Sequence, residues 1–370
     1  MEHGFTGIRK KLGFGVMRLP KVGEQVDIPA VTAMVDAFME AGFNYFDTAR
    51  PYLSGESEKA IKTCLADRYP RESFILVDKL SNSCFEKEED IRPFFQSQLE
   101  ACGVEYFDIY LMHAMNARSH EKYQATHAYD VAQQLKAEGK IRHVGFSFHD
   151  TAEVLDKILS EQPVVEIVQI QFNYADYEDT KNQSRACLEV CRKHGKPVIV
   201  MEPVRGGALA NLPEEAAAIL AELKGGSQAS YAIRFAASFE GVEMVLSGMS
   251  DMAQLEENCS FMADFKPLDE TEMAAVWKVC EVFNAQGLIP CTACKYCVDG
   301  CPMKINIPGM FYAYNDQKRF RNVKPARYEG LTKDAGKASD CIGCGQCTAV
   351  CPQRLIIPDL LDDVAKTFEQ

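Results

Sequence analysis

Short apolar runs rich in β-branched and aromatic residues alternate with longer amphipathic stretches through Met262. There are eight of these runs, and each is short enough to be a buried strand. They end near Met17, Phe46, Val77, Leu111, Phe146, Phe172, Val200 and Leu246. Most repeats take about 30 residues, the length of one strand with its helix, and eight such units close a parallel barrel. The sequence therefore predicts an α/β fold, a (β/α)8 TIM barrel.

The amphipathic stretches between these runs predict the outer helices of the barrel. Several of them end at a glycine, the residue that most often follows the last turn of a helix. The predicted helices cover residues 29–41, 56–69, 90–102, 121–138, 182–194 and 253–264. A further helix is predicted over residues 269–284, beyond the last strand.

Polar residues stand at or just after the ends of the predicted strands. They are Asp47, Lys79, His113, Ser147, Gln169, Asn173, Glu202, Ser247 and Ser250. The carboxyl ends of barrel strands meet at one rim, where barrel enzymes build their active sites. Any one of these residues can be an ordinary solvated strand end, and Asp47 with Tyr52 can be a turn residue and a half-buried aromatic. Titratable residues after three consecutive strands instead favour a chemical site.

The residues at these strand ends resemble the motifs of the aldo-keto reductases. The motifs are FDTARPY, VDKL, LMHAM, GFSFHD and LSGMS with a later ENC, and the resemblance covers about residues 10 to 265. It implies that Tyr52 donates a proton to the substrate carbonyl and that Lys79 lowers the pKa of this phenol. It also implies that Asp47 pairs with Lys79 and that His113 orients the carbonyl oxygen.

The chemistry of carbonyl reduction asks for the same residue types. Hydride transfer places negative charge on the carbonyl oxygen, so the site needs a proton donor whose pKa is brought down from about 10 by a nearby cation. A tyrosine beside a lysine meets this need, and a partner carboxylate keeps the lysine protonated in a partly dry pocket. A neutral histidine can donate a hydrogen bond without competing for the proton.

The resemblance also implies a nicotinamide site, in which Ser147 and Gln169 hold the carboxamide. It places Arg205, Gly206 and Gly207 near the pyrophosphate, and Ser247, Gly248, Ser250, Gln254, Glu257 and Asn258 around the adenine and the 2′-phosphate. A turn that opens onto a helix near Ser250 suits a phosphate. Phe148, Met201 and Glu202 depart from the usual family residues, and Glu202 would repel a pyrophosphate unless Arg205 balances it. The choice among NADP, NAD and a flavin stays open, although no flavin signature is visible.

Composition and charge add a second module to this picture. The 370 residues carry a net charge of -13, which argues against nonspecific binding to nucleic acid or to an anionic membrane. From Asn284 onward, however, eleven Lys and Arg face nine Asp and Glu. We therefore predict a barrel domain over residues 1–283 and a second domain over residues 284–370. The start of the chain has no signal-peptide pattern and no run is long enough to span a membrane, so we expect a cytoplasmic protein.

Eight of the 15 cysteines fall in two motifs of the form C-x2-C-x2-C-x3-C-P. This spacing is typical of cysteines that hold 4Fe-4S clusters, with the fourth cysteine reaching the other cluster. We expect Cys291, Cys294, Cys297 and Cys351 to bind one cluster, and Cys341, Cys344, Cys347 and Cys301 to bind the second. Zinc is a weaker alternative, because zinc sites rarely use paired four-cysteine motifs that each end in proline.

The two motifs belong to a longer repeat, since Ile307 and Pro308 recur as Ile357 and Pro358. The tail thus resembles a bacterial two-cluster ferredoxin domain, of the small α+β ferredoxin-like class. The insert between its halves carries the run KRFRNVKPAR. This basic run is either a solvated loop, a balance for cluster charge or a dock for an acidic electron-transfer protein.

These observations predict an iron-sulfur oxidoreductase of the aldo-keto reductase type. It would reduce a small carbonyl compound, or oxidise the alcohol, with NAD(P)H and Tyr52 as general acid and base. The clusters would either transfer electrons or serve a structural role. The alternative is a noncatalytic redox sensor or electron-transfer module that keeps the barrel as a scaffold, which predicts an incomplete Asp47, Tyr52, Lys79 and His113 set. Neither the substrate nor the oligomeric state follows from the sequence.

Overall fold

The computed structural model describes residues 7–223, 225–320 and 325–369. The chain forms two compact units. The first contains the chain through Pro203 together with Ile233–Leu268, and the second contains Val204–Ala232 and the chain from Asp269 onward. The chain therefore passes between these compact units at three places, and the single domain boundary after residue 283 stays a prediction. None of the described helices is both long and apolar enough to cross a membrane.

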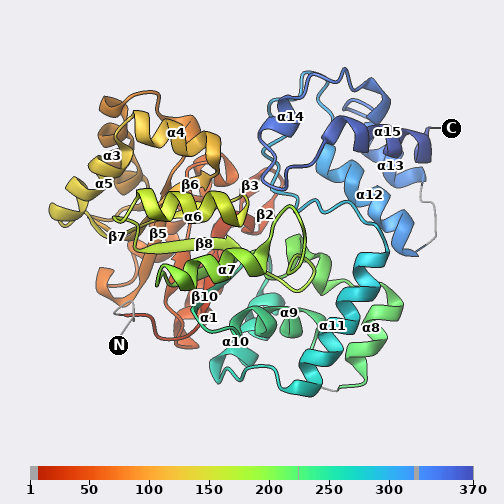
Figure 1. The fold of residues 1–370 in the computed structure, drawn as a ribbon, viewed down its shortest axis with the longest axis horizontal. Coiled ribbons are helices and arrows are strands. Elements are labelled where there is room, and N and C mark those ends of the chain that lie inside the picture. Colours follow the sequence, from red (N-terminus) through yellow and green to blue (C-terminus); the bar gives the residue numbers. More distant parts are fainter. Residues whose placement is uncertain (1–6, 224, 321–324, 370) are drawn as a thin grey trace. The chain divides into compact units, whose positions relative to one another are not determined.

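The first unit is a closed barrel of eight parallel strands, in the order β1-β10-β9-β8-β7-β6-β5-β4 (Figure 1). The strands are β1 (Leu12–Gly15), β4 (Tyr45–Asp47), β5 (Ile75–Leu80), β6 (Phe107–Met115), β7 (Ile141–Phe148), β8 (Ile167–Gln171), β9 (Val198–Met201) and β10 (Val242–Ser247). Each corresponds to one of the eight predicted apolar runs, so the predicted barrel is confirmed. Two short strands, β2 (Lys21–Val22) and β3 (Gln25–Val26), pair as an antiparallel hairpin outside it.

Amphipathic helices connect the barrel strands. They are α1 (Ile28–Glu40), α2 (Glu56–Ile61), α3 (Glu88–Cys102), α4 (Ala117–Ala125), α5 (Ala128–Ala137), α6 (Ala152–Glu161), α7 (Ser184–Lys193), α9 (Gln228–Ala237) and α10 (Met252–Ala263). The single helix predicted over residues 121–138 is wrong. The chain forms α4 and α5 instead, because His127 adopts a left-handed φ of 52°, which no α-helix can accommodate.

Inward-facing side chains from six of the eight strands fill the barrel. Tyr45, Ile75, Val77, Ile109, Leu111, Ile167, Ile199, Met244 and Leu246 form this core. Gly145 on β7 makes room for it, because a Cβ atom there would lie 2.4 Å from the carbonyl oxygen of Ile167. The same filled interior holds the strands in register, so the residues at their carboxyl ends are presented at fixed positions.

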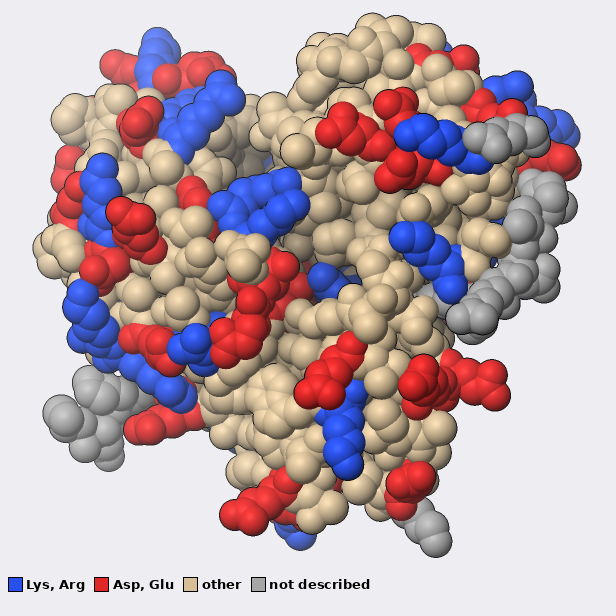
Figure 2. Space-filling model, turned by 45° about the vertical axis from the view of Figure 1, so that its right-hand side comes forward, with Lys and Arg blue, Asp and Glu red and all other residues tan. Residues whose placement is uncertain are grey.

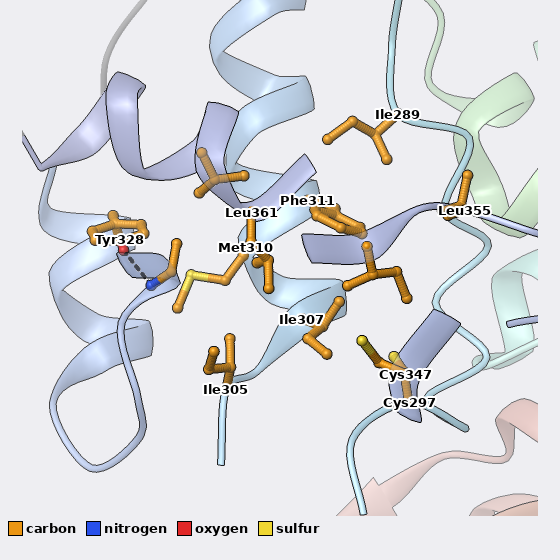
Figure 3. Packing of buried hydrophobic residues seen from close by; sticks show 13 residues of the cluster. Ile289, Cys297, Ile305, Ile307, Met310, Phe311, Tyr328, Cys347, Leu355 and Leu361 are labelled. Atoms are coloured by element: carbon orange, nitrogen blue, oxygen red, sulfur yellow. Dashed lines mark hydrogen bonds between the residues drawn. The ribbon is translucent and has the colours of Figure 1, made fainter. Parts of the chain in front are cut away.

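The second unit is mainly helical. Its helices include α8 (Glu214–Ala221), α11 (Glu270–Ala285), α12 (Ile307–Phe320), α13 (Pro325–Thr332), α14 (Gln346–Ala349) and α15 (Ile357–Phe368). A parallel bridge joins Ile305 to Gly336. Helices α12 and α15 begin at the two copies of the Ile-Pro repeat, as two related halves require. Figure 3 shows their shared core, in which Met310, Phe311 and Leu361 pack, with Cys297 and Cys347 at one edge.

Replacing Gly145 with alanine should destabilise the barrel by about 1–3 kcal/mol, because the added methyl group would overlap the backbone of β8. Gly330→Ala is the matched control, since nothing lies within 4 Å of a Cβ atom there and alanine favours helix α13. We expect urea unfolding followed by circular dichroism to show the loss only for Gly145→Ala. Equal effects of the two substitutions would mean that β7 can move away from β8.

Candidate active site and cysteine cavities

A buried ion pair between Lys79 and Asp47 forms the centre of the rim. The ammonium nitrogen of Lys79 donates to Asp47 Oδ1 at 2.6 Å and to the Thr48 carbonyl oxygen at 2.7 Å. Both charged side chains are almost completely buried. Their two strands, β4 and β5, are neighbours in the barrel, with Asp47 paired to Val77. Adjacent parallel strands thus deliver the acid and the base to the same place.

Tyr52 and His113 lie beside this pair. The Lys79 ammonium lies 4.7 Å from the centre of the Tyr52 ring. The Tyr52 and His113 rings meet edge to face, with centroids 5.9 Å apart. Tyr52 begins a short 3-10 turn, Tyr52–Gly55, in which Leu53 and Ser54 have left-handed backbone angles. The four residues that the sequence singles out for catalysis are therefore brought together.

The pKa of the Tyr52 phenol is raised well above its usual value, because the ring is shielded from water and the Asp47 and Glu202 carboxylates lie nearby. This direction is the opposite of the one expected from the sequence. The main reason is burial of the phenol, to which the Asp47 and Glu202 carboxylates add. Tyr52 thus holds its proton firmly until another charge reaches the site.

His113 is neutral in this environment. Burial and the positive charge of Lys79 hold its pKa well below the usual value. Its Nδ1 atom lies 2.8 Å from the Ser81 hydroxyl. The Tyr123 hydroxyl, which accepts from the His113 backbone N–H and donates to the Leu80 carbonyl, ties β6 to β5 behind the ring. A neutral, oriented imidazole fits the expected hydrogen-bonding role.

Ser147 and Gln169, expected to hold the nicotinamide, lie on β7 and β8 with protein partners of their own. Ser147 Oγ accepts from the backbone N–H of Ala114 at 2.8 Å. Gln169 Nε2 donates to Asp47 Oδ2 at 3.3 Å, so Asp47 is bound on both of its oxygens. Gln169 therefore helps to orient the carboxylate that pairs with Lys79, a role that the sequence did not suggest.

The end of β10 and the start of α10 hold most of the expected adenine and phosphate residues. The Asn258 amide donates to Ser247 Oγ at 3.0 Å. The backbone N–H of Ser250 donates to Gln254 Oε1, and Asp251 caps the helix by accepting from the Gln254 N–H. This capped turn occupies one helix N-terminus, as expected. The Asp251 side chain satisfies one N–H group of this turn, that of Gln254, and brings a negative charge to the helix N-terminus, which is less favourable for a phosphate.

Glu202, after β9, pairs with Arg18 at 3.4 Å, and its φ of 56° is left-handed. The sequence suggested Arg205 as the balancing charge, and it did not reveal Arg18. Arg205 belongs to the second unit, where its guanidinium lies 5.5 Å from the centre of the Phe283 ring. Gly206 packs so closely on Thr292 that a Cβ atom would lie 2.8 Å from its backbone. The loop of Arg205, Gly206 and Gly207 is thus built into the second unit.

A polar layer made by Arg50, Glu58, Asp78 and Gln98 lies behind the rim, and the sequence did not predict it. Glu58, Asp78 and Gln98 are fully buried. Asp78 was visible as an acid between Val77 and Lys79 in VDKL, on the alternate face of the strand, which normally packs against apolar helices. Arg18 and Ser81 were also missed, because their contacts join segments far apart in the sequence.

The eight motif cysteines of the second unit line two cavities. Cys291, Cys294, Cys297 and Cys351 line one, together with Phe311 and Leu355. Cys341, Cys344, Cys347 and Cys301 line the other, with Ile305 and Leu361. Each cavity encloses about 330 Å³, including space open to solvent. The fourth cysteine of each motif thus joins the three cysteines of the other motif.

Each cavity has four cysteines in its lining, the number that a 4Fe-4S cluster requires. Among the described residues, no three His, Cys, Asp or Glu side chains converge closely enough to hold one metal ion. Burial and the nearby Cys294 thiol raise the pKa of Cys297 to about 12. Iron binding must therefore displace thiol protons, as it does wherever thiolates are the ligands.

Replacing Asp47 with asparagine should destabilise the barrel by about 3–5 kcal/mol, because it leaves the Lys79 ammonium buried without a counter-charge. Adding Lys79→Met to this variant should recover most of the loss. Urea unfolding of the two single variants and the double variant measures the coupling. If the destabilisation of the double variant equals the sum of those of the two single variants, the two charges do not depend on each other.

Comparison with known proteins agrees with this geometry. The model of the aldo/keto reductase family matches residues 11–281, and the model of a 4Fe-4S dicluster domain matches residues 290–356. L-galactose dehydrogenase of Arabidopsis thaliana is 27% identical over 301 residues, which cover 75% of this chain and 93% of that protein. NADH-specific methylglyoxal reductase of Escherichia coli is 27% identical over 195 residues, which cover 47% of this chain and 57% of that protein.

Solved structures share the barrel. An aldo-keto reductase from Bacillus halodurans is similar with a TM-score of 0.61 at 23% identity, over 73% of this chain and 92% of that one. An aldo/keto reductase from Klebsiella pneumoniae in complex with NADP and acetate gives a TM-score of 0.60 at 20% identity, over 74% and 91% of the two chains. Because the family model spans most of the chain, this protein belongs to the aldo/keto reductase family, and a 4Fe-4S dicluster domain follows its barrel.

Proposed function

We propose that this protein is an iron-sulfur oxidoreductase that reduces a small carbonyl compound with NAD(P)H, or oxidises the corresponding alcohol. The observation that carries the proposal is the convergence of Tyr52 and His113 on the buried pair of Lys79 and Asp47. A noncatalytic scaffold would have no need of this set. The set is complete, and Asp47, Lys79 and His113 are buried, so it supports an enzyme over a sensor.

The four residues divide the work of proton transfer. Tyr52 is the group that gives its proton to the carbonyl oxygen, and Lys79 stabilises the tyrosinate that remains. Neutral His113 donates a hydrogen bond to the same oxygen, which lowers the cost of its developing charge. Asp47 keeps Lys79 charged without itself meeting the substrate. Burial and the nearby carboxylates raise the pKa of Tyr52, so the phenol carries its proton at neutral pH.

A nicotinamide cofactor would supply the hydride. Ser147, Gln169 and the region of residues 247–258 are the parts of the barrel that we propose for its binding. The relatives point to both nucleotides, since the Klebsiella pneumoniae structure contains NADP and the Escherichia coli relative is named NADH-specific. A binding role for Arg205 and Gly207 has less support, because their loop is built into the second unit.

We propose that the second unit holds two 4Fe-4S clusters with exchanged fourth ligands. The two cysteine cavities support this assignment, because each combines three cysteines of one motif with the last cysteine of the other. Such clusters supply one-electron transfer when bound. A hydride carries two electrons, so coupling the two halves would require electron transfer in two steps. The clusters otherwise serve as structural crosslinks.

An acidic electron-transfer partner would dock on the basic run of residues 318–327. Residues 321–324 of the basic run lie outside the described residues. On the face shown in Figure 2, basic and acidic side chains are intermixed, and neither sign covers a continuous area. The docking role therefore rests on the sequence alone.

Replacing Tyr52 with phenylalanine should lower kcat for carbonyl reduction by about 100-fold or more, because it removes only the proton donor. Affinity for NADPH and NADH, measured by fluorescence titration, should not change. Tyr45→Phe is the matched control, since the buried Tyr45 hydroxyl lies in the barrel core without a hydrogen-bond partner among the described residues. Unchanged kcat in Tyr52→Phe would end the role given to this residue.

Paired cysteine substitutions test the exchanged ligands. Cys291→Ala with Cys351→Ala should remove one cluster and half of the iron, because both thiols line the same cavity. Cys341→Ala with Cys351→Ala should damage both clusters, although these two residues belong to the same motif. Iron analysis and the electron paramagnetic resonance of the reduced protein measure the outcome. If the second pair costs only half of the iron, each motif binds its own cluster.

A further inference from the structure

A pair of carboxyl groups lies buried behind the rim, on the outer face of the barrel strands. Glu58 comes from α2 and Asp78 from β5, and both are 0% exposed. Each carboxyl group lies close enough to act on the pKa of the other. Asp78 points away from the barrel interior, because its neighbours Val77 and Lys79 point inward and strand residues alternate. Apolar side chains normally fill this layer between strands and helices.

Glu58 holds the loop that carries Tyr52. Arg50, two residues before Tyr52, donates from Nε to Glu58 Oε2 at 2.5 Å. The same guanidinium donates to Ser97 Oγ at 3.2 Å and lies 5.2 Å from the centre of the Phe94 ring. The loop is therefore clamped onto α2 and α3 by one side chain. Any change in Glu58 must reach Tyr52 through this short connection.

Asp78 holds the strand that carries Lys79. Its Oδ1 accepts from the Lys79 backbone N–H at 2.7 Å, and its Oδ2 accepts from the Cys102 thiol at 3.7 Å. Gln98 completes the connection, since its amide donates both to Glu58 Oε1 at 3.2 Å and to the Lys79 carbonyl at 3.1 Å. The Tyr110 hydroxyl orients Gln98 from β6 at 2.5 Å. The pair thus joins the two segments that present Tyr52 and Lys79.

The charges of this region balance only if the pair keeps one proton. Arg50 and Lys79 bring two positive charges, and Asp47, Glu58 and Asp78 would bring three negative ones. The other groups facing the pair, Gln98, Cys102 and Tyr110, are neutral, as is the Cys84 thiol. Burial and the neighbouring carboxyl group raise the pKa of Asp78 well above its usual value, and burial also raises that of Glu58. Two carboxyl groups so close cannot both ionise easily.

We propose that Glu58 and Asp78 share one proton and act as a positioning pair that fastens the loop of residues 50–52 to the strand carrying Lys79. The effect on turnover rests on the proposed function of Tyr52, whereas the shared proton does not. A purely apolar pair would pack as well but could not hold Arg50 and the Lys79 backbone at once.

Infrared spectroscopy detects the shared proton directly. The whole protein at neutral pH should show the carbonyl stretch of a protonated carboxyl group in a buried site, and Asp78→Asn should remove this band. Asp108→Asn is the matched control, because Asp108 is also buried but is paired with Arg71 and Arg142. It should leave the band unchanged. A parent protein without the band, or a band that survives Asp78→Asn, would overturn the proposal.

Steady-state kinetics tests the positioning role. Asp78→Leu removes the hydrogen bonds that Asp78 accepts from the Lys79 backbone and from Cys102, so kcat should fall about tenfold or more with the KM for NAD(P)H unchanged. Asp78→Asn mimics the protonated acid and should restore most of this loss. Equal kcat values for the two variants would overturn the positioning role. If the parent reduces no carbonyl compound but shows the infrared band, the proposed function fails and the shared proton stands.

The pH dependence of stability provides a third readout. A carboxyl group whose pKa is raised in the folded state stabilises the fold below its unfolded pKa of about 4 and loses this contribution as the pH rises through the folded value. An asparagine side chain at the same position does not titrate. The thermal midpoint of Asp78→Asn minus that of the parent should therefore increase as the pH is raised from about 5.5 to about 8. A constant difference would contradict a raised pKa.

Discussion

The buried contact between Lys79 and Asp47 is the interaction on which the candidate active site depends. Two opposite charges in a dry interior repay their lost hydration only when their geometry is close and their remaining hydrogen bonds are satisfied. Here the Thr48 carbonyl and the Gln169 amide satisfy them. This requirement links four strands at the rim, since β4, β5 and β8 supply the groups and β6 supplies the neighbouring His113.

Rigid strands explain why this small set can be held in place. The barrel interior is filled, so neither β4 nor β5 can slide without displacing core side chains. The loop after β4 is longer and carries left-handed residues, and it needs a separate anchor. Arg50 and the buried acids provide that anchor on the helical side of the barrel. Strand β5 thus carries a polar residue on each face: Lys79 belongs to the candidate active site, and Asp78 packs on the helical side.

In the second unit, the cysteines rather than a buried ion pair connect separate parts of the chain. Its core is small, and its cysteines reach across the two repeated halves, so each cavity includes a thiol from the other motif. Because the proposed clusters draw thiols from both halves, binding them would also hold the two halves together. The segment Val204–Ala232 follows barrel strand β9 in the sequence but belongs to the second unit. Within that unit, Gly206 packs against Thr292 of the first cysteine motif.

The sequence alone was sufficient for the barrel, the four catalytic candidates and the cysteine motifs, because these depend on local periodicity and on spacing along the chain. Where the apolar runs recur regularly, the residues that follow each run can be assigned to the carboxyl-end rim of the barrel. Only the tertiary structure revealed that Arg18 meets Glu202, that the Tyr52 phenol has a raised pKa, and that Glu58 lies against Asp78. Those outcomes depend on distances between segments that are far apart in sequence, and on the burial that arises only when the segments pack together.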